Sequence, residues 1–151
     1  RPGVWGWHRG RSGVTTVGVA GDAKSGFRRD RGGAASDGAG ERTGAALADG
    51  GFGVLPEIDV AGTWKKKLDV DFRRYRILGA CNPPLAHQAL SHELFLGALL
   101  PCNVLVIDDE AGGSIVAAFK PSEGFQMVDN PDMGPVAQEV EERLERVLAS
   151  L

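Results

Sequence analysis

Large apolar residues are concentrated in the last two thirds of the chain, where some follow a helical spacing and others form short continuous runs. Residues 135–151 repeat apolar positions three and four apart, which predicts an amphipathic helix with i,i+4 ion pairs Glu139–Arg143 and Glu142–Arg146. Three shorter runs, 74–81, 103–108 and 114–119, are rich in β-branched or aliphatic residues and predict strands. The apolar stripe of the helix consists of Val136, Val140, Leu144, Val147, Leu148 and Leu151.

Further elements precede and link these segments. GFGVLPEIDV (51–60) predicts a strand, which Pro56 places at a sheet edge or a bulge. Residues 61–69 predict a short helix, and 84–100 a helix that Pro84 opens and that breaks near Ser91 or Gly97. The turn DEAGG makes the last two strands a hairpin. The pattern therefore predicts an α+β fold, with a mixed or antiparallel sheet and helices on one face.

The N-terminal part has a different composition. The first fifty residues hold eight Lys or Arg against five Asp or Glu, a net +3, whereas the remainder holds nine against fifteen, a net −6. Only 13–21, a candidate strand, and 40–51, a candidate short helix, have the pattern of ordered elements, and 27–45 is typical of flexible chain. We therefore divide the chain into an atypical segment, 1–45, either disordered or read in a shifted frame, and a single domain, 46–151.

Overall totals exclude several classes of function. With 151 residues and a net charge of −3, the chain has no global attraction for nucleic acid or an anionic membrane. No apolar run approaches the roughly 18–20 residues that span a bilayer, and the first residues lack the apolar region of an export signal. Two cysteines without a CxxC pair indicate a reduced compartment. We therefore predict a cytoplasmic protein.

The stretch GACNPPLAHQALSHE (79–93) carries the candidate chemistry. Cys81 ends a predicted strand just before a helix, where the helix N-terminus favours a thiolate. His87 lies one turn into that helix, so the two residues are a candidate nucleophile and base. The alternative is that Cys81 packs as a small hydrophobe. Asn82 is expected to cap the helix or, less simply, to orient a ligand.

Cys102 opens the next predicted strand and extends the set of candidate residues. If the two strands are neighbours, Cys81 and Cys102 form a reversible disulfide only when their Cα atoms approach within about 7 Å. The spacing Cys81-x5-His87-x4-His92-x9-Cys102 contains no tight ligand pair, so we predict no metal site and no cofactor. The residues predicted to contact a ligand are Cys81, Asn82, Pro83, His87 and Cys102.

Three other stretches have two interpretations each. GVAGDAKS (18–25) is a near match to a phosphate-binding loop, but Ala23 replaces its second glycine. WKKKLDVDFRRYR (64–76) is either a phosphate or RNA patch or, as we expect, a solvated helix whose three aromatic residues face the core. The connection 121–134 either closes a groove or dimer interface or forms a satellite core cluster.

Three blocks resemble one known family. GFGVLPEIDV, YRILGACNPPLAHQAL and LLPCNVLV, followed by the C-terminal helix, resemble the domain of unknown function 302 family of small bacterial and archaeal proteins over about residues 46–151. The resemblance implies a β-α-β-β-β-β-α-like fold and a homodimer, with 13–21 as the first strand. Residues 27–45 depart from the amphipathic helix that the family has there. The resemblance implies no activity.

The sequence thus supports several functions of different classes. The first is a non-enzymatic domain that binds a small molecule or a protein through a dimer cleft and the 79–87 corner. The second is a thiol-dependent enzyme or redox protein that uses Cys81 and Cys102. The third is a metal-binding protein.

Overall fold

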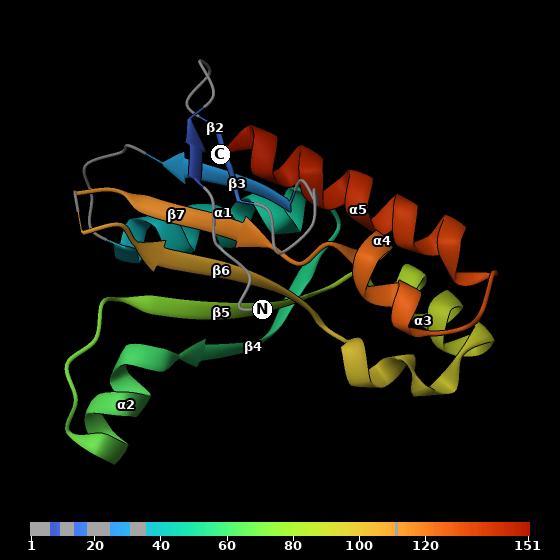
Figure 1. The fold of residues 1–151 in the computed structure, drawn as a ribbon, viewed down its shortest axis with the longest axis horizontal. Helices are drawn as coiled ribbons and strands as arrows, with labels where there is room; N and C mark the ends of the chain where they lie inside the picture. Colours follow the sequence, from blue (N-terminus) through green and yellow to red (C-terminus); the bar gives the residue numbers. More distant parts are fainter. Residues whose placement is uncertain (1–6, 10–13, 18–24, 31–35, 111) are drawn as a thin grey trace.

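The computed structural model describes residues 7–9, 14–17, 25–30, 36–110 and 112–151, and its strands form one antiparallel sheet. The order across the sheet is β1-β2-β3-β7-β6-β5-β4 (Figure 1). The predicted α+β fold is therefore confirmed. The strands are β1 (Trp7–Arg9), β2 (Val14–Val17), β3 (Ser25–Asp30), β4 (Gly53–Asp59), β5 (Tyr75–Cys81), β6 (Cys102–Asp108) and β7 (Ser114–Ala118).

Two long helices, α1 (Ser36–Asp49) and α5 (Met133–Ser150), pack on the sheet and against each other. In contrast, α2 (Val60–Leu68) extends beyond the edge strand β4 and away from the other helices (Figure 1). The predicted helix 84–100 breaks at Glu93 into α3 (Pro83–His92) and the 3₁₀ helix η1 (Leu94–Leu99). Two short helices that the sequence did not predict, α4 (Pro121–Gly124) and η2 (Phe125–Met127), precede α5.

The core divides into two apolar clusters. The larger lies between the sheet and the helices, and joins Leu78, Val104 and Val116 to the C-terminal half of α5. The smaller contains Leu96 of η1 and Phe125 of η2, with the start of α5. This arrangement confirms the satellite-cluster interpretation of 121–134 for Phe125, Val128 and Met133, whereas Met127 is 80% exposed. The predicted stripe of α5 is also confirmed, because its first five members are buried and Leu151 is half-buried.

Two N-terminal elements differ from the prediction. The stretch 27–45, expected to be flexible, contains most of β3, which pairs with β7, and most of α1. The segment 13–21 contains β2, but it is not the first strand, because β1 precedes it, and β3 lies between it and α1. The polar sequence of β3 did not indicate a strand, because its pairing with β7 depends on a segment far along the chain. Helix α1 buries three residues four apart, Ala39, Thr43 and Leu47, and their modest size hid its packing face.

The aromatic residues of the basic stretch were predicted wrongly. Trp64 and Phe72 do not face the core, because 38% and 43% of their surfaces stay exposed. Their rings pack on each other, with centroids 4.5 Å apart, and Phe72 also contacts Tyr75. None of the residues of α2 is buried, because the helix lies past the edge strand β4 and, among the described residues, away from the other helices.

Candidate functional site

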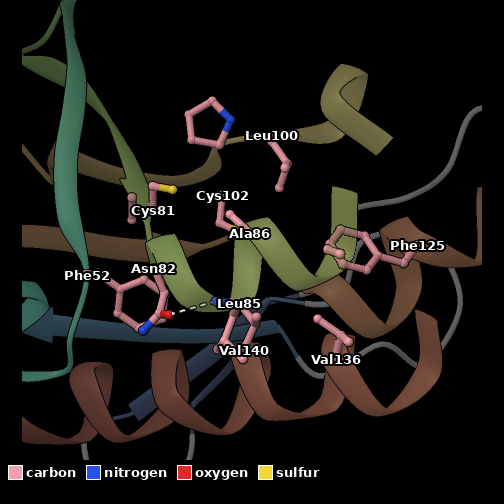
Figure 2. Close-up of a pocket in the computed structure, with 13 residues that line it drawn as sticks. Phe52, Cys81, Asn82, Leu85, Ala86, Leu100, Cys102, Phe125, Val136 and Val140 are labelled. Carbon is pink, nitrogen blue, oxygen red and sulfur yellow. Dashed lines mark hydrogen bonds between the residues drawn. The ribbon is translucent and has the colours of Figure 1, made fainter. Parts of the chain in front are cut away.

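A small apolar pocket lies where β5 ends, α3 begins and β6 starts (Figure 2). Its cavity volume is about 20 Å³, which is room for about one water molecule. The lining contains no Asp, Glu, Lys, Arg or His side chain. The lining residues are Phe52, Ala80, Cys81, Asn82, Leu85, Ala86, Ala89, Leu100, Pro101, Cys102, Phe125, Val136 and Val140.

Asn82 organises this corner through both ends of its amide. Its Oδ1 accepts a hydrogen bond from the backbone N–H of Leu85 at 3.2 Å, which is the helix cap that the sequence predicted. Its Nδ2 donates to the carbonyl oxygen of Gly51 at 3.0 Å, in the turn after α1. Asn82 therefore ties α3 to a turn 31 residues earlier in the chain; its bond to Leu85 is buried, and its bond to Gly51 is partly buried.

Gly79 of β5 lies directly against two proline rings. A Cβ atom on Gly79 would lie 2.5 Å from Cγ of Pro56 and 2.7 Å from Cγ of Pro101. Pro56 belongs to the irregular register of the edge strand β4, as the sequence predicted. Pro101 also lines the pocket, so the missing side chain of Gly79 lets segment 100–102 close the cavity.

The two cysteines line this pocket as free thiols. Cys102 is 4% exposed and pairs across the sheet with Ala80, the neighbour of the half-buried Cys81. Burial raises the pKa of the Cys102 thiol to about 11, and the nearby Cys81 adds to the increase. Cys102 is therefore protonated at neutral pH and packs as a small hydrophobe.

We expect the raised pKa of Cys102 to make the protein lose stability between about pH 9 and pH 11. Below pH 9 the thiol is protonated in both states; above it the unfolded chain ionises first, because its pKa is near 9.0. The loss is on the order of 2 kcal/mol, since one pKa unit corresponds to about 1.4 kcal/mol. Denaturant unfolding at pH 8 and pH 11 measures it. Cys102→Ala should lack this part of the loss and Cys81→Ala should keep most of it; equal losses in all three proteins would contradict the assignment.

Both predicted histidines lie outside the pocket. His87 and His92 are exposed on α3, and His92 places its Nδ1 3.8 Å from Oδ2 of Asp132. His87 is absent from the pocket lining, so the structure does not bring it to Cys81 as a candidate base. Within the described part of the chain, no three His, Cys, Asp or Glu residues form a group suited to a metal ion.

Three of the five predicted ligand-contacting residues meet at the pocket. Cys81, Asn82 and Cys102 line it, whereas Pro83 and His87 face outward. The sequence did not indicate the apolar remainder, which comes from distant segments. Val136 and Val140 had a signal as members of the stripe of α5, but nothing connected that stripe to Cys81.

The phosphate-loop-like stretch and the basic stretch add no further residues to this pocket. Residues 18–24 of the phosphate-loop-like stretch lie outside the described residues. In the basic stretch, Lys65 pairs with Asp69 at 2.8 Å and with Asp71 at 3.2 Å, so part of its charge is neutralised. Across the described ranges, no helix has both the length and the apolar character needed to cross a membrane.

These features define a class: a small α+β domain whose antiparallel sheet carries two helices on one face and whose strand-to-helix corner encloses an apolar pocket. Residues 34–151 match the domain of unknown function DUF302, and the chain belongs to this family. The match begins before the predicted boundary at 46 and includes all of α1.

A solved structure gives the same result. The crystal structure of an uncharacterized conserved DUF302 protein from Bacillus stearothermophilus is 28% identical to this chain, with a TM-score of 0.72. The alignment covers 82% of this chain and 95% of that one. None of the curated proteins matches.

Proposed function

We propose that this chain is a non-enzymatic binding domain that pairs with a second copy of itself through an exposed apolar surface on β4 and α2. The observation that carries the proposal is a group of large apolar side chains that the fold leaves 38–70% exposed. Exposed apolar groups of this size mark interaction surfaces. We call this group the β4–α2 surface: Leu55, Ile58, Trp64, Leu68, Val70 and Phe72.

The pattern of α2 supports a partner on this surface. Val60, Trp64 and Leu68 are four residues apart and form one apolar stripe, beside the three lysines 65–67. Such a stripe is normally buried against the same domain, yet α2 buries no residue. Trp and Phe are also among the side chains enriched at protein interfaces. The surface therefore has the composition of an interface core.

A second copy fits the surface better than an added β-strand. The edge strand β4 carries Pro56, which lacks a backbone N–H, and an irregular register, and both features oppose strand addition. Lys66 and Lys67 lie on α2 and Glu57, which also pairs with Arg76 at 3.3 Å, lies on β4, so a two-fold axis can face opposite charges toward each other. The family resemblance implies a homodimer as well.

Cavity volume favours the protein partner over a small molecule at the 79–87 corner. Sites for small molecules usually enclose about 300–1,000 Å³. The pocket at Cys81 and Asn82 has about 20 Å³, so a ligand larger than water has to displace lining residues. We therefore assign this corner a structural role in the unbound form.

Sedimentation of the full chain tests the proposal. Leu68→Asp places a charge on the β4–α2 surface and should weaken the dimer at least tenfold, about 1.4 kcal/mol. Leu94→Asp is the matched control, because Leu94 is 73% exposed and Leu68 is 66% exposed, but Leu94 lies on η1. A wild-type chain that stays monomeric contradicts self-association, and equal weakening by both variants contradicts the location.

A thiol–disulfide function is the second candidate, because Cys81 and Cys102 line one pocket. Hydrogen peroxide would take two electrons and two protons as the two Sγ atoms join, leaving two waters. The raised pKa of Cys102 opposes this reaction, since the thiolate is the attacking form. A mass reduced by two hydrogens after peroxide treatment supports the candidate; unchanged thiols or oxygen adducts alone remove it.

A further inference from the structure

An open cleft lies on the helical layer, between the end of α1 and the last turns of α5. Its volume is about 330 Å³, at the lower end of the range for small-molecule sites. Unlike the pocket at Cys81, the cleft has charged side chains in its lining, together with apolar ones. The lining residues are Ala46, Asp49, Gly50, Arg143, Arg146, Val147 and Ser150.

The two arginines of the cleft have unused hydrogen-bonding capacity. Arg143 donates from Nη2 to Glu139 at 2.7 Å, but its Nε is buried and has no acceptor among the described residues. Buried N–H groups in proteins nearly always have an acceptor, so this one is an exception that a ligand oxygen can satisfy after a small shift of the guanidinium.

Arg146 lacks the partner that its sequence predicted. Glu142, one turn earlier, accepts a hydrogen bond from Gln138 at 3.0 Å instead. None of the residues that the structure describes forms an ion pair with Arg146, which is exposed at the rim of the cleft. The cleft thus presents one complete guanidinium and part of a second.

Close packing holds the floor of the cleft in place. A Cβ atom on Gly50 would lie 2.5 Å from Cγ2 of Val147, so the glycine brings the end of α1 directly against α5. The next residue, Gly51, has a φ of +83°, which favours glycine and turns the chain away toward β4. Ala46 and Val147 leave an apolar floor beneath the arginines.

We propose that this cleft binds the carboxylate or phosphate of a small molecule with a short apolar body, with Arg143 and Arg146 as its ligands. Guanidinium groups recognise such oxyanions through paired N–H donors. The apolar floor accommodates the body of the molecule. Asp49 also lines the cleft, and its negative charge lowers the affinity for a simple anion.

Titration of the full chain with inorganic phosphate and with butyrate, at constant ionic strength, tests this site. Backbone amide shifts in 143–150 give the affinity for each probe. For the probe that binds, Arg146→Gln should weaken binding at least fivefold, and Asp49→Asn should strengthen it at least twofold. Arg73→Gln, which removes the same charge just before β5 and outside both the cleft and the β4–α2 surface, should leave binding unchanged.

The two probes separate the two oxyanion sources. Binding of phosphate alone assigns the cleft to phosphate esters, and binding of butyrate alone assigns it to carboxylates with an apolar body. Binding of neither probe, or equal affinities in the wild type and all three variants, overturns the proposal.

Discussion

Replacing Phe125 with alanine is expected to cost about 3–5 kcal/mol of unfolding free energy, the usual range for a buried Phe. Phe125 is 4% exposed, belongs to the smaller core cluster and lines the pocket beside α3. Its ring also packs 6.5 Å from that of Phe119, between centroids. The truncation therefore removes apolar contacts and enlarges a cavity of about 20 Å³ that has no charged lining.

An enlarged apolar cavity of this kind stays dry and accepts small aromatic molecules. We expect benzene to raise the melting temperature of Phe125→Ala and to leave that of the wild type unchanged. Phe95→Ala is the matched control, because Phe95 is 83% exposed and should change stability by less than about 0.5 kcal/mol. Equal stabilisation of the wild type by benzene would show that the pocket already admits ligands, which would favour the small-molecule function.

Gly79→Ala is expected to destabilise the protein by about 3 kcal/mol, near the upper end of the range for overpacking. The added Cβ would lie within 2.5–2.7 Å of the rings of Pro56 and Pro101. Proline rings cannot rotate away as flexible side chains do, so backbone has to move on at least one side. Movement of Pro101 would open the pocket, and we therefore also expect faster alkylation of Cys102 in this variant.

Gly44→Ala provides the control for this change in denaturant unfolding. Gly44 lies inside α1, and a Cβ atom there would meet nothing within 4 Å. The same substitution should therefore stabilise the protein by up to about 1 kcal/mol, through helix propensity and a less flexible unfolded chain. If Gly79→Ala has the same stability and the same Cys102 alkylation rate as the wild type, the prolines do not close over β5.

The parts of the fold that the sequence predicted depend on local chemistry. Asn82 followed by two prolines indicates a helix cap, and the structure contains that cap. The stripe of α5 has a regular helical period, and Pro56 marked the edge strand correctly. In each case the signal and the structure it specifies lie within a few residues of each other.

The parts that the sequence did not predict depend on distant partners. β3 pairs with the nearby β2 on one side and, on the other, with β7, which lies more than eighty residues later; its own sequence is mostly polar. The stripe of α2 identified its apolar face but not whether another layer covers that face. The pocket brings Phe125 to Cys102 through the packing of η2 on α5, which no local pattern specifies.

Helix α5 joins the two apolar clusters into one thermodynamic unit. Its first turns carry Met133 and Val136 into the smaller cluster, and its later turns carry Val140 and Leu144 into the larger one. Phe119 packs against both. Loss of packing in either cluster therefore exposes part of α5, the helix on which the other cluster also packs. The described domain should consequently unfold in a single cooperative step, and amide hydrogens near the middle of α5 should exchange only when the whole domain opens.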